Sequence, residues 1–584
     1  MLETMQSPIF EEVRRALGSP LLEKFLLPEE IGQRWSQSAG QGAAADRFVR
    51  FLENLGVTFD CAAGDLARIP RSGPVVIVAN HPFGLVEGAI LGALLQRVRP
   101  DVKFLANSLL AGVQGLEDCL IPVDPFGGAA KSNWRGLRQS IAWLSQGGLL
   151  VTFPAGEVAA LRLPRMQISE PEWNERIARV IRLTQACTVP VFFHGVNSAA
   201  FQIAGVIHPR FRTALLPREL LNKKGTNIRV AIGRPVSVES LARHGSDQEA
   251  IGYLYRRTLL LQARSAAKPF PFKLGPIHAR IAGSVDPRSM REEADKLSAA
   301  NVLLESGPYA VCVAQACEIP NTLREIGRLR EIAFRKAGEG TGRSLDLDRF
   351  DKHYQHLWVW NRETDEVCGA YRLGGTDTTS DLYTRTLFRF RPGLLEQLHP
   401  ALELGRSFVR PEYQKSYQAL LLLWKGIGRF VARHLQYRVL FGPVSISKDY
   451  NRASRSLMVS YLESSCDRRE LANGVEPRRQ FRPGRFGNWG AGLLGPQLQS
   501  LDELSEVVAD LEEDGKGVPV LLRQYLQLGG TVLAFNVDRA FSDVVDGLMV
   551  VDLGRLTPPV LEKYLGKEGA SGFRERHHLK KQSL

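Results

Sequence analysis

Short apolar runs alternate with helical patterns between residues 70 and 235, and this alternation constrains the fold of the chain more than any other feature. The apolar runs predict six strands: Val75–Ala79, Lys103–Ala106, Cys119–Val123, Leu149–Phe153, Val189–His194 and Ile228–Ile232. The stretches that repeat apolar residues at helical spacing are 87–98, 131–145, 171–186 and 215–222. Alternating strands and helices favour an α/β domain with parallel strand pairs. Residues 1–60 predict a helical N-terminal segment by the same spacing.

The second half of the chain has a different order of elements. Strands are expected at Tyr309–Ala316, in a hairpin over 357–373, at Ala401–Arg410 and at Arg438–Ile446, with helices after the first strand and over 412–435. Antiparallel strands between helices indicate an α+β domain. Residues 263–295 are punctuated by proline and glycine and keep no period, so we place the domain boundary there. The expected division is a domain over 1–275, a linker over 276–300 and a domain over 301–584.

The balance of charged residues limits the partners. The 584 residues include 75 Lys and Arg against 62 Asp and Glu, a formal net charge of +13, which favours polyanionic partners. The sequence contains no zinc-finger pattern, RNA-recognition signature or Lys/Arg block with interleaved aromatics, which argues against nucleic acid. An anionic membrane surface and an acidic carrier protein are therefore the expected partners.

Cysteine usage and hydropathy indicate the compartment. The seven cysteines are scattered and form no CxxC pair, so neither a disulfide framework nor a metal site is expected. No run approaches the roughly 18 apolar residues of a membrane span. The N-terminus has acids where a signal peptide would be basic. We therefore expect a cytoplasmic protein that is peripheral on the cytoplasmic face of the inner membrane.

A histidine and a carboxylate follow the first of the expected strands, in the segment Asn80-His81-Pro82-Phe83-Gly84-Leu85-Val86-Glu87. A histidine oriented by a carboxylate is a general base for a hydroxyl, and open α/β sheets bind ligands at strand ends. Another strand ends in Phe153-Pro154-Ala155-Gly156-Glu157, and Val189-Pro190-Val191 opens a third. Taken alone, a histidine at a strand end is more often a structural hydrogen-bonding group.

Together these segments resemble the glycerolipid acyltransferases, also called the PlsC-like or lysophospholipid acyltransferases. The ordered blocks of that family correspond to NHPFGLVE, an ill-defined block within 104–135, FPAGE and VPV, over roughly 70–236. His81 and Glu87 are separated by five residues where the family has four, and glutamate replaces aspartate. Ala155 occupies the place of the family's glutamate in the third block.

The resemblance implies that His81 removes the proton of an acceptor hydroxyl, that Glu87 orients the imidazole, and that the alkoxide attacks an acyl thioester. It implies substrate contacts for residues beside the pair and in the third block, namely Asn80, Gly84, Phe153, Pro154, Gly156 and Glu157. Lys131 and Arg135 are candidates for binding an acceptor phosphate or carboxylate, with a solvated helix face as the alternative.

Charged residues also mark the second half. Glu403 and Arg406 lie in an expected strand, where the two-residue period places them on opposite faces unless a bulge intervenes. A charge inside an apolar sheet needs a partner or a function, so a structural ion pair is the alternative to catalysis. Further charged and polar residues precede this strand: Arg330, Arg335, Asp346, Asp348, Asp351 and His356.

The C-terminal half resembles the GNAT-type N-acyltransferases over about 308–556, nearest to autoinducer synthases and bacterial ornithine N-acyltransferases. The segments that carry the resemblance are LREIAFR (329–335), Asp348…Asp351…His356-Leu-Trp-Val, GAYRL (369–373), ELGRSFV (403–409), LRQYLQLG (522–529) and FNVD (535–538). The resemblance implies catalytic roles for Glu403 and Arg406. It implies substrate contacts for Arg330, Arg335, Asp348, Asp351 and His356.

The segment after the strand that contains Glu403 indicates which kind of acyl donor the C-terminal half binds. A GNAT enzyme that uses CoA normally has glycines there, whose amides cradle the pyrophosphate. Residues 409–417 instead read VRPEYQKSY, without glycine. A pantetheine arm on acyl carrier protein has one phosphate, and the acidic carrier suits the positive charge of the chain. We expect acyl-ACP or acyl-CoA as donor, with the carrier-bound form favoured, and no metal or other cofactor.

The fusion of these two halves resembles the bifunctional ornithine-lipid synthases of bacteria. It implies N-acylation of ornithine with a 3-hydroxyacyl group by the C-terminal domain, then O-acylation of lyso-ornithine lipid by the N-terminal domain. Three alternatives stay open: a lysophospholipid (1-acylglycerol-3-phosphate-type) acyltransferase with a non-catalytic GNAT-like domain that binds carrier or membrane, a synthase of a glycine, lysine or glutamine lipid, and a non-enzymatic membrane-associated protein. Asp346, Asp348 and Asp351 would favour a cationic head group, unless they only cap a helix.

Overall fold

A computed structural model describes residues 28–579 apart from 40–43, 108–109, 111–112, 114, 124–129, 163–166, 208, 265–277, 487–488 and 491–494. The part of the expected helical N-terminal segment before residue 28 lies outside the described residues, as does the start of the expected linker. The chain divides into two compact units. One comprises Met1–Ser265 with Phe486–Asn488, and the other comprises Ala266–Arg485 with Trp489–Leu584.

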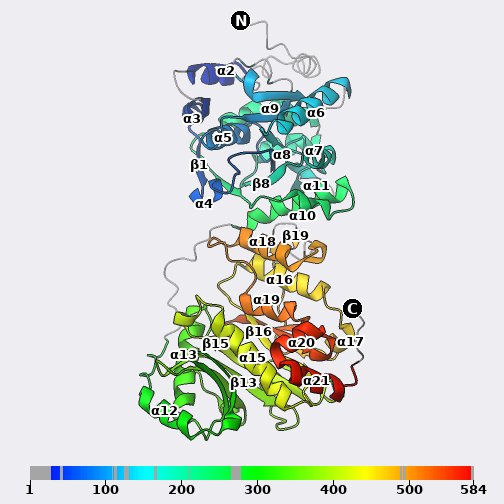
Figure 1. Cartoon of the computed structure of the whole chain (residues 1–584). Helices are drawn as coiled ribbons and strands as arrows, with labels where there is room; N and C mark the ends of the chain where they lie inside the picture. Colours follow the sequence, from blue (N-terminus) through cyan, green and yellow to red (C-terminus); the bar gives the residue numbers. More distant parts are fainter. Residues whose placement is uncertain are drawn as a thin grey trace. The chain divides into compact units, whose positions relative to one another are not determined.

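The first unit is built on a seven-stranded sheet in the order β1-β9-β8-β2-β5-β3-β4 (Figure 1). Its strands are β1 (Thr58–Cys61), β2 (Val75–Ala79), β3 (Val102–Asn107), β4 (Leu120–Val123), β5 (Leu149–Thr152), β8 (Cys187–Phe193) and β9 (Asn227–Ile232). Neighbouring strands are parallel except β8 with β9. The predicted α/β sheet with parallel pairs is confirmed, and the ends of the six expected strands shift by at most two residues.

Helices connect these strands. They are α2 (Pro28–Gln37), α3 (Ala44–Leu55), α4 (Ala63–Leu66), α5 (Val86–Leu95), α6 (Ala130–Ser145), α7 (Arg176–Thr184), α8 (Ala199–Ile207), α9 (Pro209–Leu221), α10 (Val238–Ala242) and α11 (Asp247–Leu260). The helix expected over 215–222 begins earlier, at Pro209, because proline is tolerated in the first helical turn. Several elements were not predicted. They are β1, α4, α8, α10, α11 and a short hairpin of β6 (Ala160–Arg162) and β7 (Gln167–Ser169).

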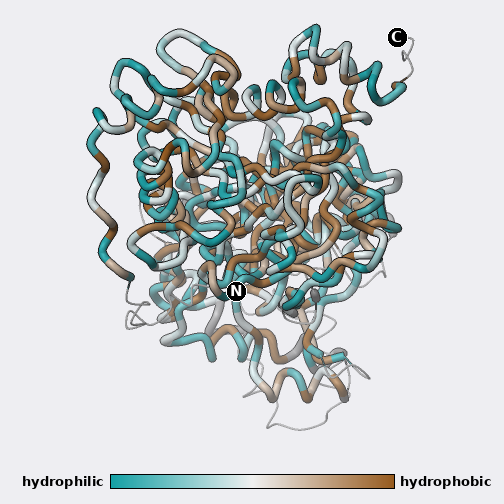
Figure 2. The backbone as a smooth tube through the Cα atoms, turned by 90° about the horizontal axis from the view of Figure 1, so that it is seen from below, coloured by the Kyte–Doolittle hydropathy of each residue, from teal (hydrophilic) through white to brown (hydrophobic). Residues whose placement is uncertain are grey.

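The interior of the first sheet explains why its strands read as unbroken apolar runs. All five residues of β2 are buried, as expected of a strand covered on both faces. Val75 and Ile77 belong to one core cluster with Ile90 of α5 and Phe48 of α3. Hydrophobic stretches, in brown, and hydrophilic stretches, in teal, alternate along the backbone (Figure 2).

The second unit is built on an eight-stranded sheet in the order β10-β11-β12-β13-β15-β16-β21-β20. Its strands are β10 (Val302–Ser306), β11 (Tyr309–Gln315), β12 (Gln355–Asn361), β13 (Glu366–Gly375), β15 (Ala401–Val409), β16 (Val439–Ile446), β20 (Thr531–Asp538) and β21 (Val544–Asp552). Neighbouring strands are antiparallel except β15 with β16. The predicted α+β class is confirmed.

The helices of the second unit pack against this sheet. They are α12 (Pro287–Lys296), α13 (Pro320–Lys336), α14 (Leu394–Leu398), α15 (Gln418–Arg433), α16 (Arg452–Ser464), α17 (Arg469–Ala472), α18 (Leu501–Leu511), α19 (Val520–Gln527), α20 (Pro558–Leu565) and α21 (Lys567–Arg576). α13 contacts β13 and β15. α20 and α21 lie beside α15, as Figure 1 shows. No helix among the described residues is both long and apolar enough to span a bilayer.

Candidate active sites

His81, on the loop that leaves β2, meets Glu87 in the first turn of α5. Nδ1 of His81 lies 3.3 Å from Oε1 of Glu87, which is fully buried, while the histidine side chain is 14% exposed. The two atoms face each other without a well-formed hydrogen bond. Such a relaxed contact is common for a catalytic pair without substrate. Gly84 adopts a φ of +115°, which glycine permits, so the loop folds back despite its five intervening residues.

The surroundings of Glu87 hold its carboxylate in the ionised form. The N–H of Phe83 donates to Oε1 at 2.6 Å, and the N–H of Gly84 donates to Oε2 at 2.9 Å. Burial alone would raise the pKa of Glu87, but His81 and the backbone donors lower that pKa below its usual range. An ionised carboxylate at Nδ1 of His81 leaves Nε2 of the imidazole to accept a substrate proton.

Two further side chains fix the position of His81. Phe153, just after β5, stacks on the imidazole with 4.4 Å between ring centroids and 27° between planes. The carboxylate of Glu170 accepts a hydrogen bond from the N–H of His81 and another, at 2.9 Å, from Nε1 of Trp173. No motif or period in the sequence points to Glu170, which follows the unpredicted strand β7. The structure therefore adds a second carboxylate to this site.

Asn80 and Gly84 were expected to bind substrate, but the fold uses their polar groups. Nδ2 of Asn80 donates to the carbonyl of Phe193 at 3.0 Å, and the N–H of Phe193 donates to Oδ1 of Asn80 at 2.6 Å. These bonds join the end of β2 to β8. The N–H of Gly84 is bound to Glu87. Both residues shape the site, and substrate contact by either one stays a prediction.

The remaining residues of the third block form a turn beyond Phe153. Gly156 has a φ of +67° and donates its N–H to the carbonyl of Phe153 at 2.9 Å. Pro154 is buried, and its carbonyl accepts an N–H at 2.9 Å. Glu157 forms an ion pair of 2.6 Å with Arg212 of α9. The carboxylate expected to contact substrate thus holds α9 to this turn.

α6 carries the two basic candidates of the ill-defined second block. Arg135 is exposed on this helix, which agrees with the alternative of a solvated face. The side chain of Lys131 lies outside the described residues. Anion binding by this pair therefore stays a prediction.

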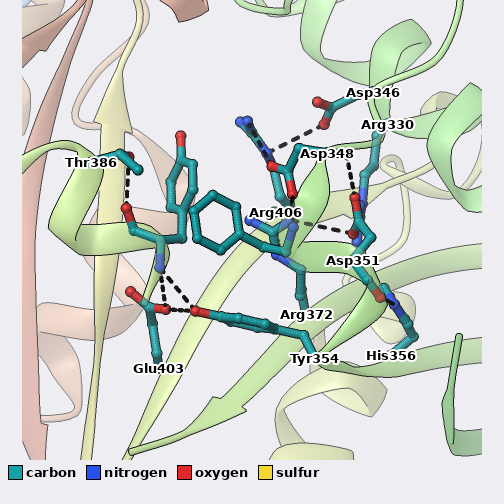
Figure 3. Close-up of polar contacts among 12 residues, drawn as sticks. Arg330, Asp346, Asp348, Asp351, Tyr354, His356, Arg372, Thr386, Glu403 and Arg406 are labelled. Carbon is teal, nitrogen blue, oxygen red and sulfur yellow. Dashed lines mark hydrogen bonds and ion pairs between the residues drawn. The ribbon is translucent and has the colours of Figure 1, made fainter. Parts of the chain in front are cut away.

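In the second unit, a bulge in β15 brings Glu403 and Arg406 into one cluster (Figure 3). The register between β13 and β15 shifts between Ala370 and Arg372. Arg406 adopts a φ of +49°, a left-handed conformation that costs a non-glycine residue about 1 kcal/mol. Both side chains then reach Tyr383. Its N–H donates to Glu403 at 3.0 Å, and its ring centroid lies 4.9 Å from the Arg406 guanidinium.

Glu403 is buried and accepts hydrogen bonds from three groups. The N–H of Thr384 donates at 2.7 Å, and the hydroxyl of Tyr354 and the N–H of Tyr383 donate to the other oxygen. Burial and the charge of Glu403 raise the pKa of Tyr354 far above its usual range, so the phenol stays protonated. The registered pairs of β15 with β16 run from Ala401 to Glu403. Glu403 therefore lies where the two parallel strands separate.

Buried arginines and aspartates form a network beside Glu403 (Figure 3). Its contacts are Arg330–Asp351 at 2.8 Å, Arg372–Asp348 at 2.6 Å, Arg372–Asp351 at 3.3 Å, Arg406–Asp346 at 3.5 Å and Arg406–Asp348 at 3.8 Å. Burial opposes the charge of Asp351, but Arg330 and Arg372 lower its pKa below the usual range. Because the three aspartates are matched by three guanidiniums, they leave no surplus charge for a cationic head group, which corrects that expectation.

His356 and Arg335 were expected to bind substrate, and both have structural partners. Nε2 of His356 lies 2.9 Å from the backbone carbonyl of Asp351, and burial lowers the pKa of the imidazole to about 4. Arg335 binds Glu331 at 2.8 Å and two backbone carbonyls at 2.9 and 2.7 Å. His356 is therefore a neutral core histidine, and Arg335 holds a loop. Substrate contact by either residue stays a prediction.

Two carboxylates within electrostatic reach of Arg406 were not predicted. Burial raises the pKa of Glu339 to about 8 and that of Asp546 to about 7, against the opposing effect of Arg406. The hydroxyl of Ser445 donates to Asp546 at 2.7 Å. Glu339 follows α13 and Asp546 lies in β21, so only the tertiary fold brings them together. In the described part of the chain, no three His, Cys, Asp or Glu residues are grouped to hold a metal ion.

Known families match both units. Residues 46–267 match the family described as Acyltransferase, and residues 329–425 match the Acetyltransferase (GNAT) domain. These are the two classes that the motifs predicted, so the prediction of two acyltransferase domains is confirmed.

Individual relatives match parts of the chain. A glycine N(alpha)-acyltransferase of Bacteroides thetaiotaomicron is 42% identical over 262 residues, which cover 40% of this chain and 74% of that protein. A lyso-glycine lipid O-acyltransferase of the same organism is 28% identical, over 29% of this chain and 64% of its own length. An L-ornithine N(alpha)-acyltransferase of Rhodobacter capsulatus is 27% identical, over 41% of this chain and 90% of its own length.

Proposed function

The chain belongs to the acyltransferase family that includes the glycine N(alpha)-acyltransferase of Bacteroides thetaiotaomicron, and from this membership we propose that it makes an aminolipid in two acyl transfers. The second unit acylates the α-amine of an amino acid with a hydroxyacyl group. The first unit acylates the hydroxyl of the resulting lyso-lipid. The observation that carries this proposal is the presence of two separate polar sites in two units, each matched by a different acyltransferase family.

In the proposed O-acyl transfer, His81 is the base. Its Nε2 accepts the hydroxyl proton of the lyso-lipid while Glu87 stabilises the resulting imidazolium from the other ring nitrogen. The alkoxide attacks the thioester carbonyl, the carbon–sulfur bond breaks, and the imidazolium returns its proton to the departing thiolate. Phe153 and Glu170 keep the imidazole oriented through the stacking and backbone contacts described above.

In the proposed N-acyl transfer, Arg406 binds the carboxylate of the amino acid. Its contacts with Asp346 and Asp348, at 3.5 and 3.8 Å, are long, and within the described structure its Nε makes no hydrogen bond. A guanidinium with available donors suits a carboxylate. Glu403, with the Tyr354 hydroxyl on its oxygen, lies where the registered pairing of β15 with β16 ends and accepts the proton of the amine as it attacks the thioester carbonyl. The carbon–sulfur bond then breaks, and the proton passes from Glu403 to the departing thiolate.

Glycine is the proposed head group. The relative named for glycine is 42% identical, against 27% for the one named for ornithine, and the three aspartates near Arg406 are already paired with arginines. Ornithine is the second candidate, because Glu339 and Asp546 are carboxylates within reach of Arg406 that a cationic side chain would stabilise as anions. Purified protein supplied with a hydroxyacyl donor and either amino acid decides between them. Faster acylation of ornithine would overturn the glycine assignment.

An acyl carrier protein is the proposed donor. The N-terminus of α15 carries no glycine loop, and the exposed side chain of Tyr417 stands there with its hydroxyl bound to Gln524. A pyrophosphate has no backbone cradle at this place, whereas a single pantetheine phosphate needs fewer donors. We expect kcat/KM to be at least about tenfold higher with hydroxyacyl carrier protein than with the same acyl-CoA. Equal values would contradict a carrier-specific site.

Expression in a bacterium that lacks aminolipids tests the division of labour. Mass spectrometry of extracted lipids should show a diacylated aminolipid with the wild-type chain. His81→Ala should accumulate the lyso form, and Arg406→Ala should yield neither form unless lyso-lipid is supplied. His353→Ala, at an exposed histidine, is the matched control and should behave as wild type.

Two outcomes would contradict the proposal. Complete lipid from His81→Ala would remove His81 from the O-acyl transfer. If the wild-type chain forms no aminolipid but acylates a supplied lysophospholipid, the lysophospholipid acyltransferase alternative is correct. In that case the second unit serves only to bind a carrier or a membrane.

A further inference from the structure

α8 and α9 form a helical hairpin that exposes apolar side chains to solvent. Ile203 and Val206 of α8 are 61% and 42% exposed, and Val196, on the segment that leads into the hairpin, is 53% exposed. These are three of the seven large hydrophobic side chains that are exposed among the described residues. We call Val196, Ile203, Val206 and the exposed Lys224 the hairpin face. Ile203 and Val206 are three residues apart in α8 and therefore lie on one face of the helix, and exposed apolar side chains gathered on one face mark an interaction surface.

The charge of this segment is one-sided. Residues 196–225 contain a single acid, Glu219, and the five basic residues Arg210, Arg212, Arg218, Lys223 and Lys224. Glu219 is buried and turned inward, where it accepts the N–H of Ser198 at 3.0 Å and lies 3.6 Å from Nζ of Lys223. Arg212 is paired with Glu157 and Lys223 lies beside Glu219, so Lys224 is the exposed base next to the apolar side chains. Exposed apolar side chains beside an exposed base match an anionic bilayer.

The other side of the hairpin packs on the first active site. A Cβ added to Gly84 would come 2.6 Å from Cδ2 of Leu216, so α9 lies directly against the loop that carries His81. Nδ2 of Asn197 donates to the carbonyl of Phe83 at 3.1 Å, on the same loop. Arg212 holds the turn after β5 through Glu157. The hairpin therefore has one side on the catalytic loop and one side in solvent.

We propose that the hairpin face docks the first unit on an anionic phospholipid bilayer, with Ile203 and Val206 inserted below the headgroups. A lyso-lipid in that bilayer then has a short path to the loop of His81, because the docking element and the loop are in contact. The choice of a lipid as substrate rests on the proposed function. Docking on the bilayer does not depend on the proposed function, so binding to vesicles is measured without any acyl transfer.

Vesicle flotation of the full chain tests the proposal. Vesicles of phosphatidylethanolamine with about one quarter phosphatidylglycerol should carry the wild-type chain. The double variant Ile203→Asp/Val206→Asp should lower the partition coefficient by about tenfold or more, because charges replace two inserted apolar side chains. Leu183→Asp on α7, at a position that is 65% exposed, is the matched control and should float as wild type. Ile203→Trp, which keeps an apolar anchor, should bind at least as tightly as wild type.

The outcomes separate docking from folding and from chemistry. Equal flotation of the double variant and wild type would overturn the proposal, as would an equal loss in Leu183→Asp. Loss of a dimer in the double variant, with vesicle binding unchanged, would assign the face to a second copy of the chain instead. The double variant should still acylate lyso-lipid dissolved in detergent at the wild-type rate. If wild type floats but shows no O-acyl transfer, the proposed function fails while the docking surface stands.

Discussion

Glu170 and Asp546 are buried carboxylates outside the predicted site residues, and each acts on a neighbouring functional group. Glu170 accepts the N–H of His81, and Asp546 lies within electrostatic reach of Arg406. Burial raises the pKa of both groups, because an ionised carboxylate loses its hydration. The chemistry of the two sites therefore depends on side chains from elements other than those that carry His81 and Arg406.

Glu170→Ala should lower kcat of the O-acyl transfer by about tenfold with a smaller change in KM, since the loop of His81 loses one hydrogen bond to a charged group. The N-acyl transfer should be unchanged. Steady-state kinetics with each substrate measure this. Glu172→Ala, two residues away and exposed, is the control. A purely structural role would instead lower the thermal midpoint without changing kcat of the folded enzyme.

Asp546→Asn should stabilise the protein more at pH 8 than at pH 5. The pKa of Asp546 is raised to about 7, so the folded state holds this proton more tightly than the unfolded state. Stability is therefore lost as the pH rises from about 4 through 7, and the neutral amide avoids that loss, on the order of 4 kcal/mol. Thermal midpoints at both pH values measure it. Asp543→Asn, at an exposed position, should give a shift that does not depend on pH.

The strand β15 shows how one element creates a site by interrupting its own pairing. Its bulge turns Arg406 toward Tyr383, and its registered pairing with β16 ends at Glu403. Beyond the last registered pair, the backbone of β16 still passes close to β15. A Cβ on Gly442 would lie 2.0 Å from the carbonyl oxygen of Leu404. This close approach of the two backbones therefore depends on Gly442 in the neighbouring strand.

Gly442→Ala should lower the thermal midpoint of the second unit by several degrees, on the order of 2 kcal/mol, because the new methyl group collides with backbone that cannot move without breaking β15. Calorimetry of the full chain measures this. Gly405→Ala lies on the adjacent strand, where a Cβ meets nothing within 4 Å, and should leave the midpoint unchanged. Equal midpoints for the two variants would show that β16 can shift without cost.

The whole molecule is two units with separate cores. The first core surrounds Val75 and Ile77, and the second unit has clusters around Trp358 and Phe388. In Bacteroides thetaiotaomicron the matched N-acyl and O-acyl relatives are separate proteins. A unit with its own core can fold alone. We therefore propose that the two units, which divide between Ser265 and Ala266, are two independent enzymes.

Two chains, 1–265 and 278–584, should together restore aminolipid synthesis when they are co-expressed. Each keeps its site and most of its core, but the lyso-lipid must now diffuse between proteins, because the link no longer gives a high effective concentration. Lipid mass spectrometry should show the complete lipid with more lyso form than the intact chain produces. Soluble halves that make no lipid at all would show that the units depend on each other.

The sequence by itself determined the two fold classes and the His81–Glu87 pair. Strand and helix periods are local, and the seven-residue segment from His81 to Glu87 can bring a base to its carboxylate without knowledge of the rest of the chain. Only the tertiary structure decided which charges are free to act. In the folded chain, Asp348 and Asp351 form ion pairs with arginines, and Asn80 joins two strands. Glu170, Tyr383 and Asp546 lie at the sites although they are distant in the sequence. The physical reason is that burial and partners set the role of a charged group, and both come from residues distant in the sequence.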